Sequence, residues 1–299
     1  MNETTLNKYR KAGTIASNAR DYGVKLIKSG VDFLEVAKKV ESRIVEKGGD
    51  LAFPVNISIN EVAAHYSPKH NDKNTFNKGD VVKLDVGAHV DGYIADTAIT
   101  VEVESKNYND MIKASSNALD VAIETIKPGI DLALVGKSIE DTIKSKGFNS
   151  INNLTGHSLE KFSLHSGISV PNVGDMFCKV RPKVGDVFAI EPFATDGAGH
   201  VISGDGSNIF LCQGSIKAKF IRDNKLKLLY NKFHSKFNSL PFAQRWAENI
   251  FSNSEIALRK LTFYGLLRHY PQLIEAKKGI VTQKEHTVII TEDGCEVTT

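Results

Sequence analysis

Two aspartates on one expected hairpin could do chemistry together. Asp85 and Asp96 lie in β-rich runs on either side of the turn signal Asp91-Gly92. A hairpin folded about Val90-Asp91 would place the two carboxylates directly opposite each other, with Cβ atoms about 5 Å apart. Two half-buried carboxylates that close repel each other, and a bound divalent cation removes the repulsion. The alternative is a pair of solvent-facing strand acids, which is common on hairpins.

Three further residues could complete a metal site. His157 follows a glycine, which favours a loop or strand end where the ring points inward, although a lone histidine is more often structural. Glu191 lies inside an apolar run, where an unpaired carboxylate is costly. Glu285 opens a β-rich run near the C-terminus. Four carboxylates and one imidazole suit two divalent ions about 3.5–4 Å apart, as in aminopeptidases and phosphatases, better than structural zinc.

Two repeated patterns indicate that similar halves position these residues. Residues 27–41 and 126–140 share seven of fifteen positions, and each places Gly then Asp before an apolar-periodic run. Residues 79–85 (GDVVKLD) and 185–191 (GDVFAIE) each open a strand that ends in a carboxylate. The offsets of 99 and 106 nearly agree, so two αβ halves would bring these two carboxylates to matching places. Coincidence between short amphipathic segments is the alternative.

The local patterns predict four helices and five strands around the expected site. Asp32 and Asp131 are expected as N-caps of equivalent helices. The helices are expected near 5–29, 32–47, 106–126 and 132–146. The strands are expected near 50–59, 81–88, 93–103, 187–194 and 286–291.

Composition and cysteine usage indicate the class of protein. The 41% apolar and 24% charged residues are typical of a soluble globular chain. No run approaches the roughly 20 apolar residues of a membrane helix, and no signal peptide begins the chain, so we expect a cytoplasmic protein without membrane contact. Three widely spaced cysteines, Cys178, Cys212 and Cys295, favour a reducing compartment and core positions rather than disulfides or metal ligation.

A basic segment interrupts the second half. Residues 214–278 contain thirteen Lys and Arg against four Asp and Glu, a net +9 in a chain of +3, so the remainder carries −6. Pro241 suits a first helical turn after Ser239, and Ser254 suits the start of another helix. We therefore expect a catalytic domain of residues 1–205 and 277–299, with residues 206–276 as an inserted helical, winged-helix-like subdomain.

Together, these motifs resemble the methionine aminopeptidases of the pita-bread family. The order Asp, Asp, His, Glu, Glu, with the first two eleven apart, is similar to their metal ligands. The long gap between Glu191 and Glu285 resembles the type 2 branch, and the lack of a long charged N-terminal extension resembles its archaeal members. The likeness runs over nearly the whole chain and is strongest in AFPVNISINEVAAHY (52–66), LDVGAHVDGYIADTA (84–98), LTGHSLEKFSLH (154–165), AIEPFAT (189–195) and QKEHT (283–287).

The resemblance implies a fold and a metal centre. The fold would be α/β (α+β), with two pseudo-symmetric halves around a shared curved antiparallel sheet and a helical insert. Two divalent ions, of Co, Mn, Fe, Zn or Ni, would be bound. Asp96 and Glu285 would bridge them, Asp85 would complete one, and His157 and Glu191 the other.

The resemblance also implies the remaining roles. His65 and His165 would line the cleft without binding metal, and Glu191 would shuttle a proton. Phe53 and Leu164 would line the methionine pocket. A hydroxide bridging the metals would release the initiator methionine from nascent polypeptides whose second residue is small. Without the resemblance, both cleft histidines could be ordinary surface or core residues.

The basic segment and the family resemblance also indicate possible partners and rival functions. We expect a monomer whose basic lysines, Lys217, Lys219, Lys225, Lys227, Lys232 and Lys236, dock it to ribosomal RNA. A solvated, solubilising helical face is the alternative for these lysines. A non-catalytic pita-bread binding protein is one rival function, which bound metal and peptide turnover would exclude. A peptidase acting before proline is the other, which Met-Ala and Ala-Pro peptides would distinguish.

Overall fold

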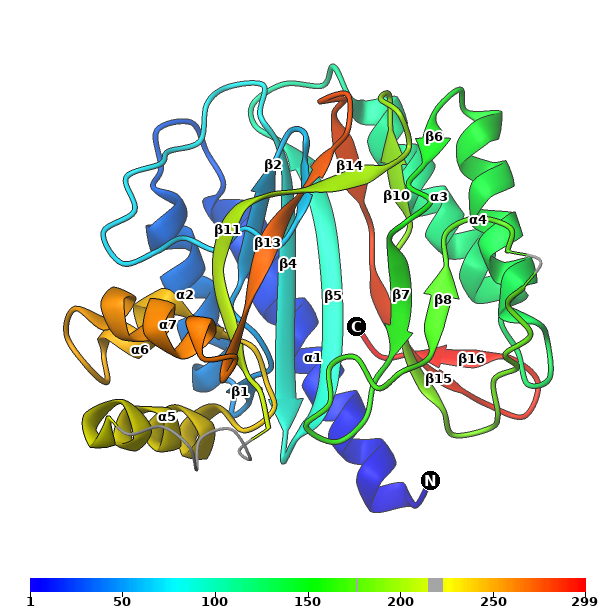
Figure 1. The fold of residues 1–299 in the computed structure, drawn as a ribbon. Coiled ribbons are helices and arrows are strands. Elements are labelled where there is room, and N and C mark those ends of the chain that lie inside the picture. The colour runs from blue at the N-terminus through cyan, green and yellow to red at the C-terminus, as the bar shows by residue number, and fades with distance from the viewer. Residues whose placement is uncertain (176, 215–222) are drawn as a thin grey trace.

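Two αβ halves and a helical segment make up the fold of the protein (Figure 1). The computed structural model describes residues 1–175, 177–214 and 223–299. In each half a pair of helices covers one face of antiparallel strands, and the helical segment lies beside the first half. None of the described helices combines the length and the apolar character needed to cross a bilayer.

The first half packs two helices on a four-stranded sheet. Its order is β1-β4-β2, with β5 paired to the long strand β4. Apolar residues of both helices, such as Ala16 and Val40, are fully buried against Leu84 and Val86 of β4. The elements are α1 (Glu3–Leu26), α2 (Phe33–Glu46), β1 (Asp50–Leu51), β2 (Asn56–Ile59), β4 (Val81–Val90) and β5 (Tyr93–Glu102).

The second half repeats this arrangement with shorter strands. Its sheets have the orders β16-β15-β9-β7-β8 and β14-β10-β6. The halves join where the Glu285 N–H donates to Ala98 O at 3.0 Å. The elements are α3 (Asn109–Thr125), α4 (Leu132–Ser145), β6 (Asn149–Ser150), β7 (Thr155–Ser158), β8 (Ser169–Pro171), β9 (Val187–Ile190), β10 (Phe193–Thr195), β14 (Val281–Gln283), β15 (His286–Ile290) and β16 (Cys295–Val297).

The helical segment has a core of its own, built around Tyr230, Phe233 and Phe242. Its sheet has the order β12-β11-β13-β3. The prediction of a helix beginning at Pro241 is wrong, because Phe242 instead pairs with Phe210 of the neighbouring strand and the helix begins afterwards. The elements are β3 (Val62–Ala64), β11 (Val201–Cys212), α5 (Asn224–Phe237), β12 (Phe242–Ala243), α6 (Gln244–Glu248), α7 (Ser254–Phe263) and β13 (Leu267–Glu275).

The four predicted helices are confirmed to within a few residues, whereas two predicted strands are each divided. The strand expected over 50–59 is broken around Pro54, and that over 187–194 is broken before Pro192, which has no N–H to donate to a sheet. Asp32 and Asp131 occupy N-cap positions, but neither side chain accepts a capping hydrogen bond. Within the described chain all three cysteines are free and partly buried.

The predicted register of the aspartate hairpin is wrong by one step. The turn consists of Asp91-Gly92, with φ values of 53° and 87°, rather than of Val90-Asp91. Two consecutive positive φ angles are what a two-residue hairpin turn requires, and glycine adopts one of them freely. Asp96 therefore pairs with Gly87, two positions from Asp85. The two carboxylates share a face of the sheet as diagonal neighbours, at roughly 7–8 Å between Cα positions, not directly opposite.

Candidate metal centre

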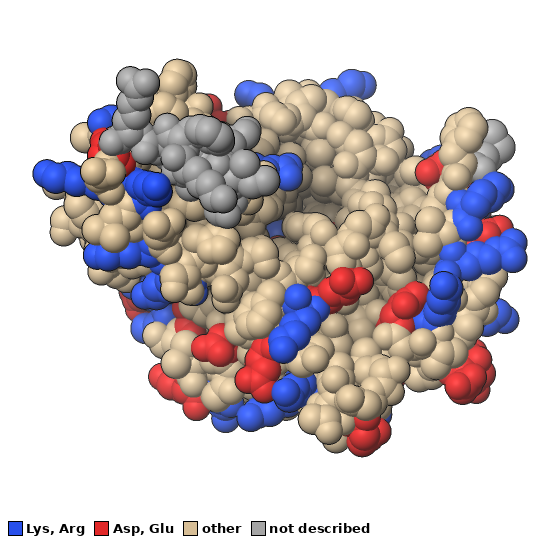
Figure 2. Space-filling view, turned by 60° about the horizontal axis from the view of Figure 1, so that its bottom comes forward, with Lys and Arg blue, Asp and Glu red and all other residues tan. Residues whose placement is uncertain are grey.

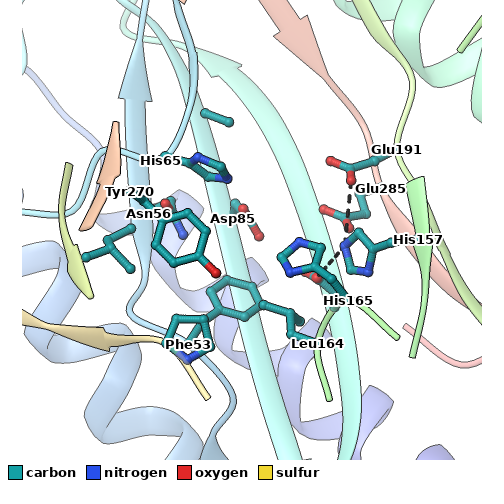
Figure 3. A pocket seen from close by; sticks show the side chains of 14 residues that line it. Phe53, Asn56, His65, Asp85, His157, Leu164, His165, Glu191, Tyr270 and Glu285 are labelled. Atoms are coloured by element: carbon teal, nitrogen blue, oxygen red, sulfur yellow. Dashed lines mark ion pairs between the residues drawn. The ribbon is translucent and has the colours of Figure 1, made fainter. Parts of the chain in front are cut away.

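All nine predicted site residues line one cavity of about 510 Å³ at the junction of the two halves. Figure 3 shows His157, Glu191 and Glu285 on one side and Phe53 and His65 on the other. The carboxylates come from β4, β5, the end of β9 and the link between β14 and β15, and the imidazole comes from β7. The nine residues are Phe53, His65, Asp85, Asp96, His157, Leu164, His165, Glu191 and Glu285.

The geometry of three of these residues fits a single metal ion. One possible ligand atom each of Asp96, His157 and Glu285 lies within 4.8 Å of the other two. His157 Nε2 lies 3.6 Å from Asp96 Oδ2 and 3.7 Å from Glu191 Oε1. Burial lowers the pKa of His157 to about 3, so the ring is neutral and keeps a lone pair to offer.

The carboxylates have the electrostatics of a site that needs cations. Burial raises the pKa of Asp85 to about 7, and burial followed by mutual repulsion raises the pKa values of Asp96 and Glu285 well above their usual range. Burial does the same for Glu191. No described lysine or arginine forms an ion pair with any of the four. Buried acids without such a partner are costly. Asp96, only 4% exposed, also excludes the alternative of solvent-facing strand acids.

Buried carboxylate oxygens without hydrogen-bond partners also indicate that these residues could bind metal ions. Asp85 Oδ1 and Asp96 Oδ1 are buried, and neither has a hydrogen-bond partner among the described residues. Buried oxygens of this kind are nearly always satisfied, by a protein group, a water or an ion. A hard, oxygen-rich set with one neutral imidazole suits divalent ions such as Mn²⁺, Fe²⁺ or Co²⁺. The residues therefore fit a metal centre.

Hydrogen bonds from neighbouring residues orient the candidate ligands. Thr287 Oγ1 accepts from the Asp96 N–H at 2.7 Å and donates to Asp96 O at 2.8 Å. Gln283 Nε2 donates to Glu191 Oε2 at 3.2 Å and to Glu285 Oε2 at 3.3 Å. Sequence reasoning missed Gln283, although its place two residues before Glu285 in the QKEHT motif was a usable signal.

An apolar wall lies beside the carboxylates. Phe53 and Leu164 are 5% and 7% exposed and belong to one buried cluster. The Phe53 ring lies over β4 at Gly87, where an added Cβ would come within 2.1 Å of the ring. Glycine at this position therefore makes room for the ring. Tyr270 completes the wall and also escaped the sequence analysis, because nothing in its local pattern marks a strand residue that faces a cavity.

The two predicted cleft histidines lie at the mouth of this cavity. His65 has a φ of 67°, an uncommon value for a non-glycine residue, and packs edge-on against the Tyr270 ring at 5.3 Å. Burial lowers its pKa to about 4, with a smaller effect from the charge of His165. The His165 ring lies 4.3 Å from that of His157, and burial lowers its pKa too. Both rings are therefore neutral near pH 7.

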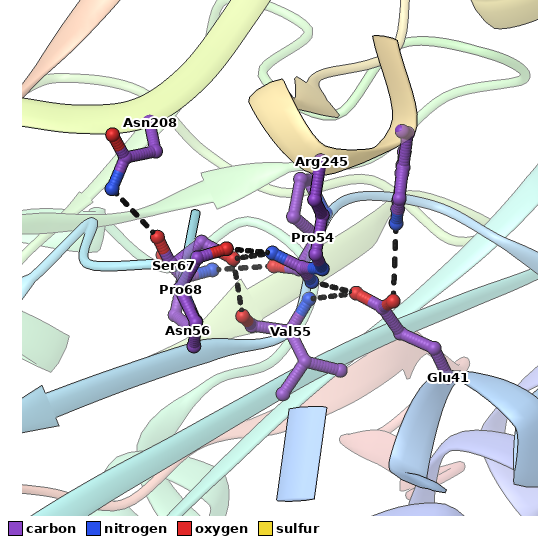
Figure 4. Close-up of polar contacts among 9 residues, drawn as sticks. Glu41, Pro54, Val55, Asn56, Ser67, Pro68, Asn208 and Arg245 are labelled. Carbon is purple, nitrogen blue, oxygen red and sulfur yellow. Dashed lines mark hydrogen bonds and ion pairs between the residues drawn. The ribbon is translucent and has the colours of Figure 1, made fainter. Parts of the chain in front are cut away.

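A buried polar network fixes the wall that carries Phe53 and His65 (Figure 4). Arg245 of α6 forms an ion pair with Glu41 of α2, and both side chains are almost inaccessible. Arg245 Nη1 also donates to Ser67 Oγ at 2.8 Å, and Ser67 Oγ donates to Val55 O at 2.8 Å. The Trp246 indole donates to Glu41 Oε2 at 3.0 Å. The helical segment and α2 are thereby tied to both ends of the 53–67 segment.

The sequence comparisons agree with this site. Residues 7–292 match the profile of metallopeptidase family M24. The chain belongs to this family. The methionine aminopeptidase of Pyrococcus abyssi is 44% identical over 296 residues, covering 98% of this chain and 99% of the relative. That of Methanocaldococcus jannaschii is 48% identical over 295 residues, covering 97% and 96%.

The structural comparisons confirm the predicted α/β pita-bread fold. A thermophilic Arx1 superposes with a TM-score of 0.86 at 18% identity, over 100% of this chain and 91% of the other. The methionine aminopeptidase of Thermotoga maritima gives a TM-score of 0.73 at 23% identity, over 100% and 98%. At these identities the likeness establishes the fold alone. As a member of a metallopeptidase family, the chain is a hydrolase that uses divalent metal ions.

Proposed function

We propose that the protein is a methionine aminopeptidase that removes the initiator methionine from nascent polypeptides whose second residue is small. One observation carries the proposal: the carboxylate and imidazole cluster opens directly onto the apolar wall of Phe53 and Leu164 within one cavity. The cluster suits a substrate's terminal amine, and the wall suits an unbranched thioether side chain. The relatives named methionine aminopeptidase over nearly the whole chain support the same substrate.

The cluster would hold two divalent ions, with Asp96 and Glu285 as ligands of both, Asp85 as a further ligand of one, and His157 and Glu191 as further ligands of the other. Co, Mn, Fe, Zn and Ni all tolerate such ligands. When bound, such ions supply a water that ionises near neutral pH and an electrophile for the scissile carbonyl.

The chain's own groups then bind, orient and transfer protons. Phe53 and Leu164 hold the methionine side chain and exclude water from it. The Glu191 carboxylate accepts a proton from the attacking water and passes it to the leaving amine. The neutral ring of His65 donates an N–H to the substrate carbonyl oxygen, where negative charge develops. His165 binds the substrate backbone from the other side of the cavity mouth.

A comparison of two peptides tests the proposal. Metal-loaded protein should hydrolyse Met-Ala-Ser and leave Ala-Pro-Ser intact, because the apolar wall favours a long unbranched first side chain. Preferential cleavage of Ala-Pro-Ser would indicate a peptidase acting before proline. Failure to cleave either peptide, with metal shown to be bound, would indicate the non-catalytic alternative.

The domain boundaries and the cellular setting are part of the proposal. A catalytic domain of residues 1–205 and 277–299 with an insert of 206–276 is supported by the separate core of the helical segment. A monomer in the cytoplasm is proposed as the form that meets nascent chains. Measurement of the molar mass in solution tests the oligomeric state.

Docking to ribosomal RNA through the basic segment is also proposed. Lys225, Lys232 and Lys236 on α5 are exposed and Lys227 is partly buried, whereas Lys217 and Lys219 lie outside the described residues. Figure 2 shows Lys and Arg side chains around this segment, but others gather on the opposite edge of the same face. Positive charge is thus not confined to the insert, and the solubilising alternative stays open for these lysines.

A further inference from the structure

A second cavity adjoins the metal cavity and is bounded by the same side chains. It has a volume of about 900 Å³. Five of its lining residues also line the metal cavity, and they are His65, Leu164, His165, Pro241 and Tyr270. The face that comes forward in Figure 2 is hollowed at its middle, and most residues around the hollow are uncharged. A chain that leaves the metal cavity past the two histidines would enter this second space.

Among the described residues that line the second cavity, Arg268 supplies the only full charge. The others are histidines, serines, leucines, a proline and a tyrosine. Arg268 is an exposed residue of β13, and its guanidinium lies 4.9 Å from the centre of the Tyr270 ring. Among the described residues it forms no ion pair. The guanidinium thus lies against Tyr270, which lines both cavities, and its N–H groups make no hydrogen bond to a described residue.

The charge of Arg268 affects three side chains that line both cavities. It contributes to the lowered pKa values of His165 and His65, although burial is the larger cause for each. The same charge opposes the rise that burial gives to the pKa of Tyr270. All three groups border both cavities, so a negative charge placed among them would be attracted to Arg268. A positive charge there would be repelled.

We propose that Arg268 makes the second cavity a subsite for a substrate carboxylate beyond the second residue, so that the enzyme favours Asp or Glu at the third position. The proposal rests on the aminopeptidase function above. In a peptide whose amine is at the metal cluster and whose first side chain contacts Phe53, the third residue lies two extended residues away, about 7 Å along the chain. This direction leads past His65 and His165 towards Arg268. The C-terminal carboxylate of a tripeptide has the same chemistry and would reach the same group.

Specificity constants for matched peptides test this subsite. The set is Met-Ala-Glu-amide, Met-Ala-Gln-amide, Met-Ala-Lys-amide and Met-Ala-Gln with a free C-terminus. For an exposed ion pair we expect kcat/KM of the Glu peptide to exceed that of the Gln peptide about two- to fivefold at low ionic strength, mainly through KM, and less at high salt. The Lys peptide should be the poorest substrate. An advantage of the free acid over its amide would assign the effect to a terminal carboxylate as well.

Variants assign the preference to the residue. Arg268→Gln should equalise the Glu and Gln peptides, and Arg268→Glu should make the Lys peptide the best substrate. Ratios between peptides cancel any change in His65 or His165 that affects all substrates alike. Arg259→Gln, at an exposed site on α7, is the matched control and should keep the wild-type ratios. Equal ratios in wild type and both Arg268 variants would overturn the subsite, whereas no cleavage of any peptide would overturn the proposed function itself.

Discussion

Loss of the Arg245 side chain should be among the most destabilising single changes outside the metal cluster. The Arg245 and Glu41 side chains are 3% and 9% exposed. Arg245→Ala leaves the Glu41 carboxylate buried with two neutral donors, the Val55 N–H at 3.2 Å and the Trp246 indole at 3.0 Å. Removing one partner of a buried ion pair costs about 3–5 kcal/mol, because the other charge stays buried without compensation.

Urea denaturation followed by circular dichroism measures this loss. With an m-value of about 3 kcal/mol per molar urea, the midpoint should fall by about 1–1.7 M. Arg259→Ala is the matched control, because its i,i+4 pair with Glu255 has side chains that are 79% and 65% exposed. Such a pair contributes at most about 0.5 kcal/mol.

The same change should weaken substrate binding. Ser67 and Val55 lose their link to α6, and they flank the segment between Phe53 and His65. KM for Met-Ala-Ser should therefore rise more than kcat falls. Arg245→Lys should recover part of the stability, and it serves as the test variant if the alanine form does not fold. Equal midpoints for Arg245→Ala and Arg259→Ala would refute the reasoning.

Three further outcomes follow from the site and the basic segment. Above pH 7.5 most histidines are neutral whether the chain is folded or unfolded, but folded Asp85, with a pKa of about 7, and the other buried carboxylates, with pKa values raised further, still bind protons that the unfolded chain has lost. Chelated protein should therefore melt at a lower temperature at pH 8.5 than at pH 7.5, and Asp85→Asn should reduce the difference. His65→Ala should lower kcat/KM by about 10²-fold, the loss typical of a removed oxyanion donor, with unchanged metal content by elemental analysis. Replacing the six basic-segment lysines by Glu should abolish salt-sensitive co-sedimentation with ribosomes but leave Met-Ala-Ser hydrolysis intact. Equal sedimentation would rule out docking.

Short motifs predicted most of the candidate site because each proposed ligand lies in a recognisable local setting. Glu191 directly follows the apolar strand β9, His157 follows a glycine in a short strand, and Glu285 directly precedes β15. The duplicated segments also indicated the two halves, and their two carboxylates, Asp85 and Glu191, both line the metal cavity. The hairpin register failed because it depends on backbone angles at Asp91-Gly92, and a one-step error there changes every pairing along both strands.

Contacts between residues far apart in the sequence could not be predicted from local patterns. Arg245 and Glu41 are 204 residues apart, and nothing near either residue indicates that both are buried together. Tyr270 and Arg268 lie in a segment whose pattern predicted helices, yet β13 pairs with β11 and carries them to the cavities. The helix predicted to begin at Pro241 was wrong for a similar reason. The pairing of Phe242 with Phe210 outweighed the preference of proline for the first turn of a helix.

A metal titration with paired readouts tests the central claim most directly. Chelated protein should be inactive towards Met-Ala-Ser, and Mn²⁺ or Co²⁺ should restore hydrolysis in step with metal bound, measured by calorimetry on the same sample. His157→Ala should remain folded by circular dichroism, bind metal more weakly and lose most activity, because one neutral ligand is removed from the cluster. Hydrolysis by fully chelated wild type, or wild-type turnover by His157→Ala, would contradict a metal-dependent site built on these residues.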